Sequence, residues 1–252
     1  MRGFAAFAHK ELLGLLRSYR ALILLVVLLL FGMMSPLFAK LTPQILKSFS
    51  GSGVTITLPP VTMTDAWAQF FKNIGQMGLI VLLLLFGTSL PQEIAGGTLL
   101  IPLSKGLSRG AVVLAKYGAA LLCWTVGYAL AAFVCCGYTQ MLFGRFAAPH
   151  LLPALFCLWL FGAFLLALLE LFGTAVPGSF GGLLLIALTA GVLLAMDAFP
   201  RLQGWNPATL ATQNAVWLTK AAPHIWLAVW VTGGSIVGCL ALCVGLFRKR
   251  TL

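Results

Sequence analysis

Few side chains in this sequence are of types that perform chemistry, and their spacing is that of packing residues. The chain has 252 residues, with only five acidic side chains and three histidines. All six cysteines fall in apolar stretches, and the two that lie one helical turn apart, Cys239 and Cys243, have no histidine at ligand spacing. We interpret these thiols as small residues packed between helices; a metal or redox pair is the alternative.

Catalytic groups and a nucleotide-binding loop are also missing from the sequence. No G-x-x-x-x-G-K-[ST] segment occurs, so the chain has no phosphate-binding loop of that kind. Serines in the apolar stretches have no histidine at the same depth to activate them, and no two carboxylates are placed to work as a pair. We therefore expect a protein that is not an enzyme and that holds neither a metal nor a cofactor.

Glu170 and Asp197 are acidic residues that fall near the ends of apolar stretches. A charge costs about 2.5–3.5 kcal/mol at the middle of a membrane and less near either surface. We expect both side chains to reach the interface or to cap a helix; a proton relay is the alternative.

Long apolar stretches without charge dominate the chain. Hydrophobic residues make up 61% and charged residues 8% of it, whereas a soluble domain averages roughly 25% charged residues. A helix of about 20 residues crosses the hydrocarbon layer of a membrane. The sequence predicts an all-α membrane protein that forms a single domain over residues 1–252. Its six transmembrane helices are expected at about 21–39, 74–90, 112–141, 151–171, 180–198 and 225–247.

The net charge of +11 is explained by the membrane rather than by nucleic acid, which we do not expect as a partner. If the N-terminus is cytoplasmic, ten Lys and Arg residues lie inside and six outside, which the positive-inside rule favours; the opposite orientation is the alternative. Six crossings then place the C-terminus in the cytoplasm as well.

Three segments outside the predicted spans have patterns of their own. Residues 2–18 repeat Phe and Leu near helical spacing with basic residues between them, which predicts an amphipathic interfacial helix on the inner face; a plain leader into the first span is the alternative. Residues 200–224 are too long for a turn and predict one or two short re-entrant helices in the outer leaflet. Trp67, Phe70 and Phe71 form a helical stripe that predicts an interfacial helix before the second span.

The segment between the second and third spans carries the densest signals. Pro91 is expected to end the second span, and Glu93 to lie in the first turn of a short helix, where the macrodipole favours an anion. Gly97 predicts a bend, and Ser108 predicts the N-cap of the third span. The leucines between them are too apolar for water alone. They predict a short helix parallel to the inner face, covered by lipid or a protein partner; an ordinary loop is the alternative.

This segment resembles the signature of ABC-2-type transporter permeases, the membrane subunits of bacterial ATP-binding-cassette exporters. That signature is Glu-x-x-x-Gly-Thr, a Leu-rich stretch, Ser-Arg and then a Lys. The matching residues are Glu93, Gly97, Thr98, the stretch Leu99–Leu103, Ser108, Arg109 and Lys116. Gly96 departs from the pattern, because many members carry a charge there. The six predicted spans and the long outer segment before the last one extend the resemblance over nearly the whole chain.

The resemblance implies a permease subunit that forms the export pathway as a dimer, with a second copy or a paralogue, in the bacterial inner membrane. ATP and Mg²⁺ would be bound by a separate cytoplasmic ABC ATPase dimer, and the short coupling helix would fit a groove of that ATPase. The residues expected to couple the subunits are Glu93, Gly97, Thr98, Leu99, Leu100, Leu103, Ser108 and Arg109. The small residues expected to pack permease against permease are Gly181, Gly182, Ala187 and Gly191.

Other functions are less favoured by the residues. A stand-alone channel or facilitator without nucleotide dependence is the main alternative. Ion-coupled transport is disfavoured because the central parts of the predicted spans carry no ionisable residue. An apolar pathway favours lipophilic or amphipathic cargo.

Overall fold

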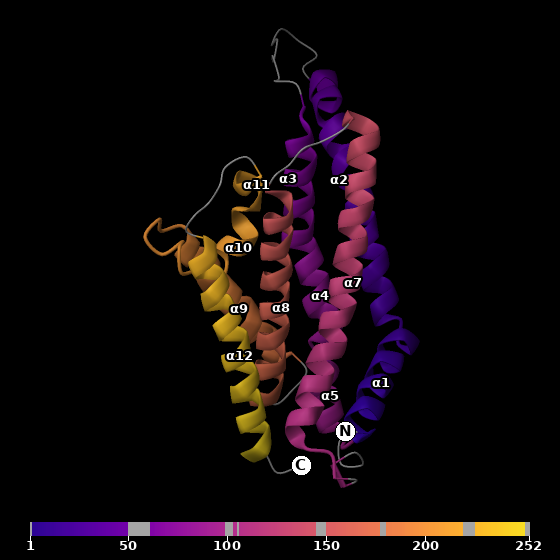
Figure 1. Ribbon diagram of the computed structural model, residues 1–252, viewed down its shortest axis with the longest axis vertical. Helices are drawn as coiled ribbons and strands as arrows, with labels where there is room; N and C mark the ends of the chain where they lie inside the picture. Colours follow the sequence, from indigo (N-terminus) through magenta and orange to yellow (C-terminus); the bar gives the residue numbers. More distant parts are fainter. Residues whose placement is uncertain are drawn as a thin grey trace.

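The computed structural model describes residues 2–49, 61–98, 103–104, 106–144, 150–176, 180–218 and 225–249. In these ranges every regular element is helical and no strand occurs, as predicted. The long helices stand side by side as a bundle (Figure 1). The elements are α1 (Arg2–Arg17), α2 (Arg20–Phe49), α3 (Met63–Asn73), the π-helix η1 (Ile74–Gly78), α4 (Leu79–Phe86), α5 (Ser89–Ala95), α7 (Arg109–Phe143), α8 (Leu151–Ala175), α9 (Gly181–Asp197), α10 (Thr209–Thr212), α11 (Asn214–Trp217) and α12 (Ile225–Lys249).

Five helical segments are long and apolar enough to cross a membrane, which makes this a multi-pass membrane protein. The segments are Arg20–Gln44, Met63–Glu93, Arg109–Phe143, Leu151–Ala175 and Ile225–Arg248. The predicted span at 180–198 forms α9, an apolar helix of 17 residues that is shorter than the other five. Its length is roughly 26 Å at the usual helical rise, so a sixth crossing remains a prediction.

The second span begins earlier than the sequence indicated. Helices α3, η1 and α4 follow one another without interruption, and a capping box formed by Thr62 and Asp65 starts them, with Thr62 N donating to Asp65 Oδ2 at 2.7 Å. Trp67 and Phe70, expected at the headgroup level, are 1% and 0% exposed because α3 packs against α2 and α7. The aromatic stripe is therefore part of the protein core.

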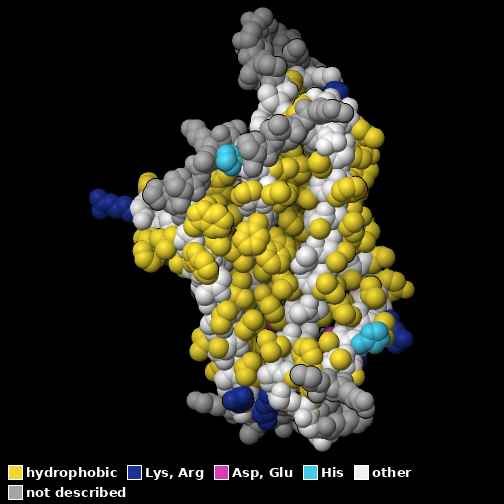
Figure 2. Space-filling view, viewed as in Figure 1, with side chains coloured by type: hydrophobic (Ala, Val, Ile, Leu, Met, Phe, Trp, Pro, Cys, Tyr) yellow, Lys and Arg dark blue, Asp and Glu magenta, His cyan; other side chains and the backbone are white. Residues whose placement is uncertain are grey.

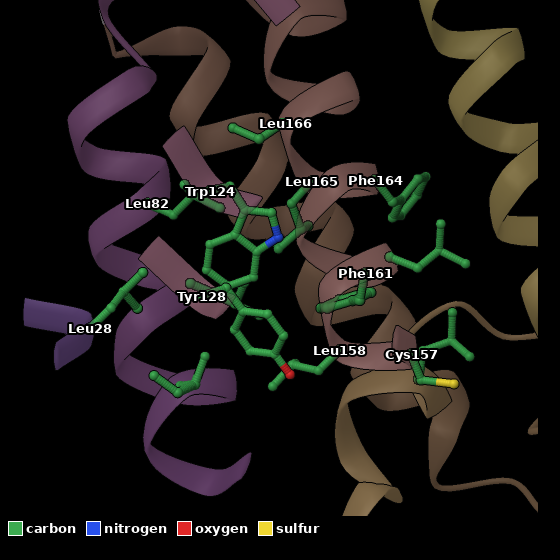
Figure 3. Packing of buried hydrophobic residues seen from close by; sticks show 14 of the residues in the cluster. Leu28, Leu82, Trp124, Tyr128, Cys157, Leu158, Phe161, Phe164, Leu165 and Leu166 are labelled. Carbon is green, nitrogen blue, oxygen red and sulfur yellow. The ribbon is translucent and has the colours of Figure 1, made fainter. Parts of the chain in front are cut away.

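The centre of the bundle is the contact between α7 and α8. Trp124 and Tyr128 of α7 stack with 5.1 Å between their ring centroids and lie among leucines of neighbouring helices (Figure 3). The indole Nε1 donates to Trp159 O, and the Tyr128 hydroxyl donates to Leu155 O, each at 3.1 Å. Gly162 makes room for the indole, since a Cβ there would lie 2.5 Å from the ring. These contacts fix the two helices together and leave no polar ring atom without a partner.

The sides of the bundle are apolar, and the basic residues gather toward its ends (Figure 2). Large exposed side chains include Leu184 and Leu188 on α9, and Trp230 and Val237 on α12, each more than 60% exposed. A continuous apolar surface of this kind is stable against lipid and unstable in water.

The start of α1, α5 and the end of α12 lie at the same end of the bundle (Figure 1). The helix predicted over residues 2–18 is confirmed, since α1 covers Arg2–Arg17. Tyr19, with a φ of 58°, makes the bend into α2. Phe7 and Leu15 are buried against the bundle, and Phe4 and Leu16 face outward. Placement of α1 at the membrane interface remains a prediction.

Two short helices, α10 and α11, lie at the opposite end of the bundle (Figure 1). They fall within the predicted segment 200–224, of which residues 219–224 are outside the described part of the chain. Both pack against α8, and α11 also contacts α3. Their re-entrant position in the outer leaflet remains a prediction.

Candidate functional site: a buried charge cluster beside a polar cavity

Four charged side chains from three helices meet at the end of the bundle where α1 starts. Lys116 of α7 lies between two carboxylates: its Nζ is 3.0 Å from Glu11 Oε2 on α1 and 2.8 Å from Glu93 Oε2 on α5. Lys10 adds a second cation, 3.1 Å from Glu11 Oε1 and 4.0 Å from Glu93 Oε1. The side chain of Lys116 is 3% exposed, whereas that of Lys10 is 60% exposed. We call these four residues the charge cluster.

The helical repeat points these side chains into the protein. On α1, Glu11 is one turn from both Phe7 and Leu15, which are buried, so it shares their face. On α7, Lys116 is one turn from both Val112 and Ala120, which are buried as well. Each charge therefore lies within an apolar stripe that faces another helix.

Glu93 reaches the cluster because the helix break comes earlier than predicted. The chain turns at Gly87 and Thr88, and α5 begins at the next residue. Pro91 thus lies in the first turn of α5, where its missing N–H leaves no hydrogen bond unmade. Glu93 lies in the last turn of α5, so its predicted place in the first turn of a new helix is wrong. A helix C-terminus disfavours an anion, and the ion pair with Lys116 offsets this.

The burial of Lys116 makes the charge cluster a joint between three helices. Taking an ammonium out of water costs several kcal/mol, and here two carboxylates within 3.0 Å offset that cost. Removing one side of a buried pair costs about 3–5 kcal/mol, because an unpaired charge remains. Helices α1, α5 and α7 are therefore held to one another at this end of the bundle.

Glu170 of α8 is a further acidic residue in this region, and it forms no ion pair with any of the residues that the structure describes. It is 3% exposed, and its Oε2 has no hydrogen-bond partner among the residues that the structure describes. The expectation that Glu170 reaches the interface or caps a helix is wrong. Helix α12 packs against α8, and Cys243 donates from Sγ to Glu170 O at 3.4 Å, so this position is enclosed.

A cavity of about 310 Å³ lies between the charge cluster and Glu170. Gly14, Ala119 and Ala120 line it and keep it open, and a Cβ added to Gly14 would meet nothing within 4 Å. Ten of the fifteen lining residues are polar, with three cations and three acids among them, although their aliphatic parts make much of the surface apolar. The polar lining residues are Lys10, Glu11, Ser18, Arg20, Ser89, Gln92, Glu93, Thr98, Lys116 and Glu170.

Ser108 and Arg109, predicted to couple to an ATPase, organise the start of α7. Ser108 is the predicted N-cap, and its hydroxyl accepts from Ala111 N at 3.2 Å. Arg109 Nη1 donates to Phe247 O at 2.6 Å and to Arg248 O at 3.0 Å. A cation at the end of α12 is also favoured by the helix dipole. The start of α7 is thus fastened to the end of α12.

The remaining predicted coupling residues lie on the segment that follows α5. Gly97 has a positive φ of 65°, which confirms the predicted bend, and Thr98 Oγ1 donates to Glu93 O at 3.4 Å. Leu103 is half-buried and packs against the apolar cluster that contains Phe7. Leu99 and Leu100 lie outside the described residues. The predicted helix parallel to the membrane falls largely on that part of the chain and stays a prediction.

The four small residues of the fifth predicted span divide into two pairs. Gly182 is buried against α8, where a Cβ would lie 3.2 Å from Gly173 N, and a Cβ on Gly181 would lie 2.6 Å from Val176. Ala187 and Gly191 are exposed on α9, and a Cβ on Gly191 would meet nothing within 4 Å. The first pair is used within the chain, and the second pair lies on a surface open to another molecule.

At the end of the bundle that carries α10 and α11, the polar contacts mainly hold short helices in place. Asp197 ends α9 and accepts hydrogen bonds from the hydroxyls of Thr209 at 3.1 Å and Thr212 at 2.6 Å, which fastens α10. An open cavity of about 560 Å³ beside it has Trp205 and Trp217 in its lining. The described residues contain no group of three or more His, Cys, Asp or Glu side chains that could hold a metal ion.

Sequence reasoning identified Glu93 and Lys116 but missed Lys10, Glu11 and the buried state of Glu170. The signal for Glu11 was present, because an acid between Phe7 and Leu15 at a spacing of four interrupts an apolar stripe. Burial of Glu170 depends on α12 and has no local signal.

Comparison with known proteins adds no assignment. The sequence matches none of the protein-family models, and no curated protein matches it significantly. The resemblance to ABC-2-type permeases therefore rests on the sequence between Glu93 and Lys116 and on the predicted order of the spans.

Proposed function

We propose that this chain is the transmembrane permease subunit of an ATP-binding-cassette exporter, driven by ATP hydrolysis on separate ATPase subunits. The observation that carries the proposal is the ion pair between Glu93 and Lys116. These two residues are the acid and the lysine of the motif that resembles ABC-2-type permeases. Their contact links the segment that would bind the ATPase to a helix long enough to cross the membrane.

The charge cluster supplies a route for mechanical force. A partner that displaces the segment after α5 also displaces Glu93, and Lys116 and Glu11 must follow, because separation would expose an unpaired buried charge. Helix α7 has 35 residues, so movement at its start reaches the far side of the bundle. The hydrogen bonds from Arg109 carry the same movement to α12.

In this proposal the end that holds the charge cluster is cytoplasmic, and the protein lies in the bacterial inner membrane. A second copy or a paralogue covers the apolar faces of α9 and α12, where Ala187 and Gly191 allow another helix to approach closely. The pathway forms between the two permeases and takes lipophilic or amphipathic cargo. ATP and Mg²⁺ belong to the cytoplasmic ATPase dimer.

The test is permease-dependent ATPase activity. The chain is co-expressed with candidate ABC ATPases, and a complex that co-purifies is reconstituted in liposomes. Glu93→Gln and Lys116→Met are expected to remove most of the stimulation of ATP hydrolysis. Asp197→Asn, which removes an acidic charge at the opposite end, is the matched control and is expected to retain it.

Two outcomes overturn the proposal. The first is full stimulation in both cluster variants. The second is solute flux through the purified chain in liposomes without ATPase or nucleotide, which is the behaviour of a stand-alone channel or facilitator.

A further inference from the structure

We propose that the cavity between the charge cluster and Glu170 binds the headgroup of an aminophospholipid, with the primary ammonium of the lipid at Glu170 and its phosphate at Lys10 and Arg20. This inference concerns binding to the chain alone, so it stands independently of the proposed export function.

The ammonium end of the ligand is indicated by Glu170. Its Oε2 is buried and has no hydrogen-bond partner among the described residues, although the residue lines a cavity. Lys116, the buried cation nearby, is already shared between Glu11 and Glu93 at 3.0 and 2.8 Å. A buried carboxyl group is stable as the anion only where donors and positive charge reach it, and a primary ammonium supplies both.

The phosphate end is indicated by cations elsewhere in the cavity lining. Lys10 pairs with Glu11 at 3.1 Å but is 60% exposed, so its ammonium can also reach a ligand oxygen, and Arg20 is half-buried at the start of α2. Arg20 Nη2 donates to Gln92 Oε1 at 3.5 Å, and within the described part of the chain this long bond leaves most of the guanidinium donors for a ligand. Lysine and arginine both bind phosphate oxygens well. A zwitterion with an inner ammonium and an outer phosphate therefore matches the order of charges.

The depth of the cavity fits a lipid headgroup. Lys116 is two turns from the start of α7, and Glu170 is little more than one turn from the end of α8, which places them roughly 10 and 8 Å from the helix ends. With the helix ends at the membrane surface, this is the depth at which headgroups meet acyl chains. The cavity volume of about 310 Å³ admits a headgroup, while the acyl chains would lie along the apolar side of the bundle.

The chemistry favours a primary amine over the other cations of a cell. A choline headgroup has no N–H to donate to Glu170, so phosphatidylcholine is the natural comparison lipid. A metal ion is disfavoured, because the described residues offer no cluster of three suitable ligands.

The experiment is native mass spectrometry of the purified full chain in detergent, titrated with phosphatidylethanolamine or with phosphatidylcholine of the same acyl chains. The wild-type chain is expected to bind phosphatidylethanolamine preferentially. Glu170→Gln, which keeps size and removes charge, is expected to lose this preference. Asp197→Asn, at the other end of the bundle, is expected to keep it.

A second variant separates loss of binding from loss of folding. Gly14→Phe fills the cavity from a position where an added Cβ meets nothing, and it is expected to lose the same preference while remaining monodisperse. Soluble O-phosphoethanolamine is the probe for a free ligand. Binding of this probe without binding of the lipid overturns the lipid assignment. Equal binding of both lipids by the wild-type chain, or an unchanged preference in Glu170→Gln and Gly14→Phe, overturns the site.

Discussion

Replacing Lys116 with methionine removes the buried cation of the charge cluster while keeping a long, flexible side chain. Glu11 Oε2 and Glu93 Oε2 then lose a partner at 3.0 and 2.8 Å. Breaking a fully buried ion pair from one side costs about 3–5 kcal/mol. The side chain of Glu93 is 26% exposed, and Lys10 remains 3.1 Å from Glu11, so we expect the lower end of this range, about 3 kcal/mol.

The matched control removes all three charges together. Lys116→Met combined with Glu11→Gln and Glu93→Gln leaves Lys10 as the one charge of the cluster, and its side chain is 60% exposed to water. The stability of this variant is expected within about 1 kcal/mol of wild type. The assay is reversible unfolding of the purified chain in mixed micelles by increasing SDS. Tryptophan fluorescence reports the transition, because Trp67 and Trp124 are buried in the core.

Two results would refute this reasoning. A single variant as stable as wild type would mean that water already satisfies Glu11 and Glu93. A triple variant no more stable than the single one would mean that the loss of stability does not come from leaving Glu11 and Glu93 unpaired.

Three further substitutions test other parts of the bundle. Gly162→Ala puts a Cβ 2.5 Å from the Trp124 ring and is expected to destabilise the chain by about 1–3 kcal/mol in the same assay, whereas Gly137→Ala, where a Cβ meets nothing within 4 Å, is expected to change little. Ser108→Ala removes the hydroxyl that caps α7 and is expected to lower the stability by about 1 kcal/mol. An unchanged stability would contradict the capping role. Arg109→Met removes two hydrogen bonds to the end of α12, and faster hydrogen exchange in the last turn of α12 is expected; unchanged exchange would show that the contact does not hold this end.

Helix content and membrane insertion could be predicted because they depend on composition and on the length of uncharged stretches. Four of the predicted spans fall within single long helices, α2, α7, α8 and α12. The start of the second span could not be placed, because the capping box at Thr62 begins a helix whose aromatic face is buried by other helices rather than by headgroups. Whether α9 is long enough to cross the membrane depends on a few residues at its ends, and the hydropathy of the sequence does not place those ends.

Only part of the candidate site could be predicted from the sequence. Glu93 and Lys116 were singled out by the motif, but their contact depends on the turn at Gly87, which sets the direction of α5. Glu170 is close in sequence to the end of its helix, and this suggested exposure. Its burial comes from the packing of α12 on α8, which no local pattern encodes.

The geometry of Glu93 separates binding of the ATPase from transmission of its movement, two roles that the motif alone would assign to one residue. Its Oε2 is 2.8 Å from Lys116, and only a quarter of its side chain is exposed, so an ATPase that bound the carboxylate directly would have to compete with this ion pair. Thr98, by contrast, is exposed on the segment that follows. Within the proposed function, the surface after α5 therefore makes the contact with the ATPase, and Glu93 passes the displacement to α7 and α1. Binding and stimulation should then separate: Glu93→Gln keeps the affinity for the ATPase and lowers stimulation, whereas a bulky charged residue at Thr98 weakens the affinity itself.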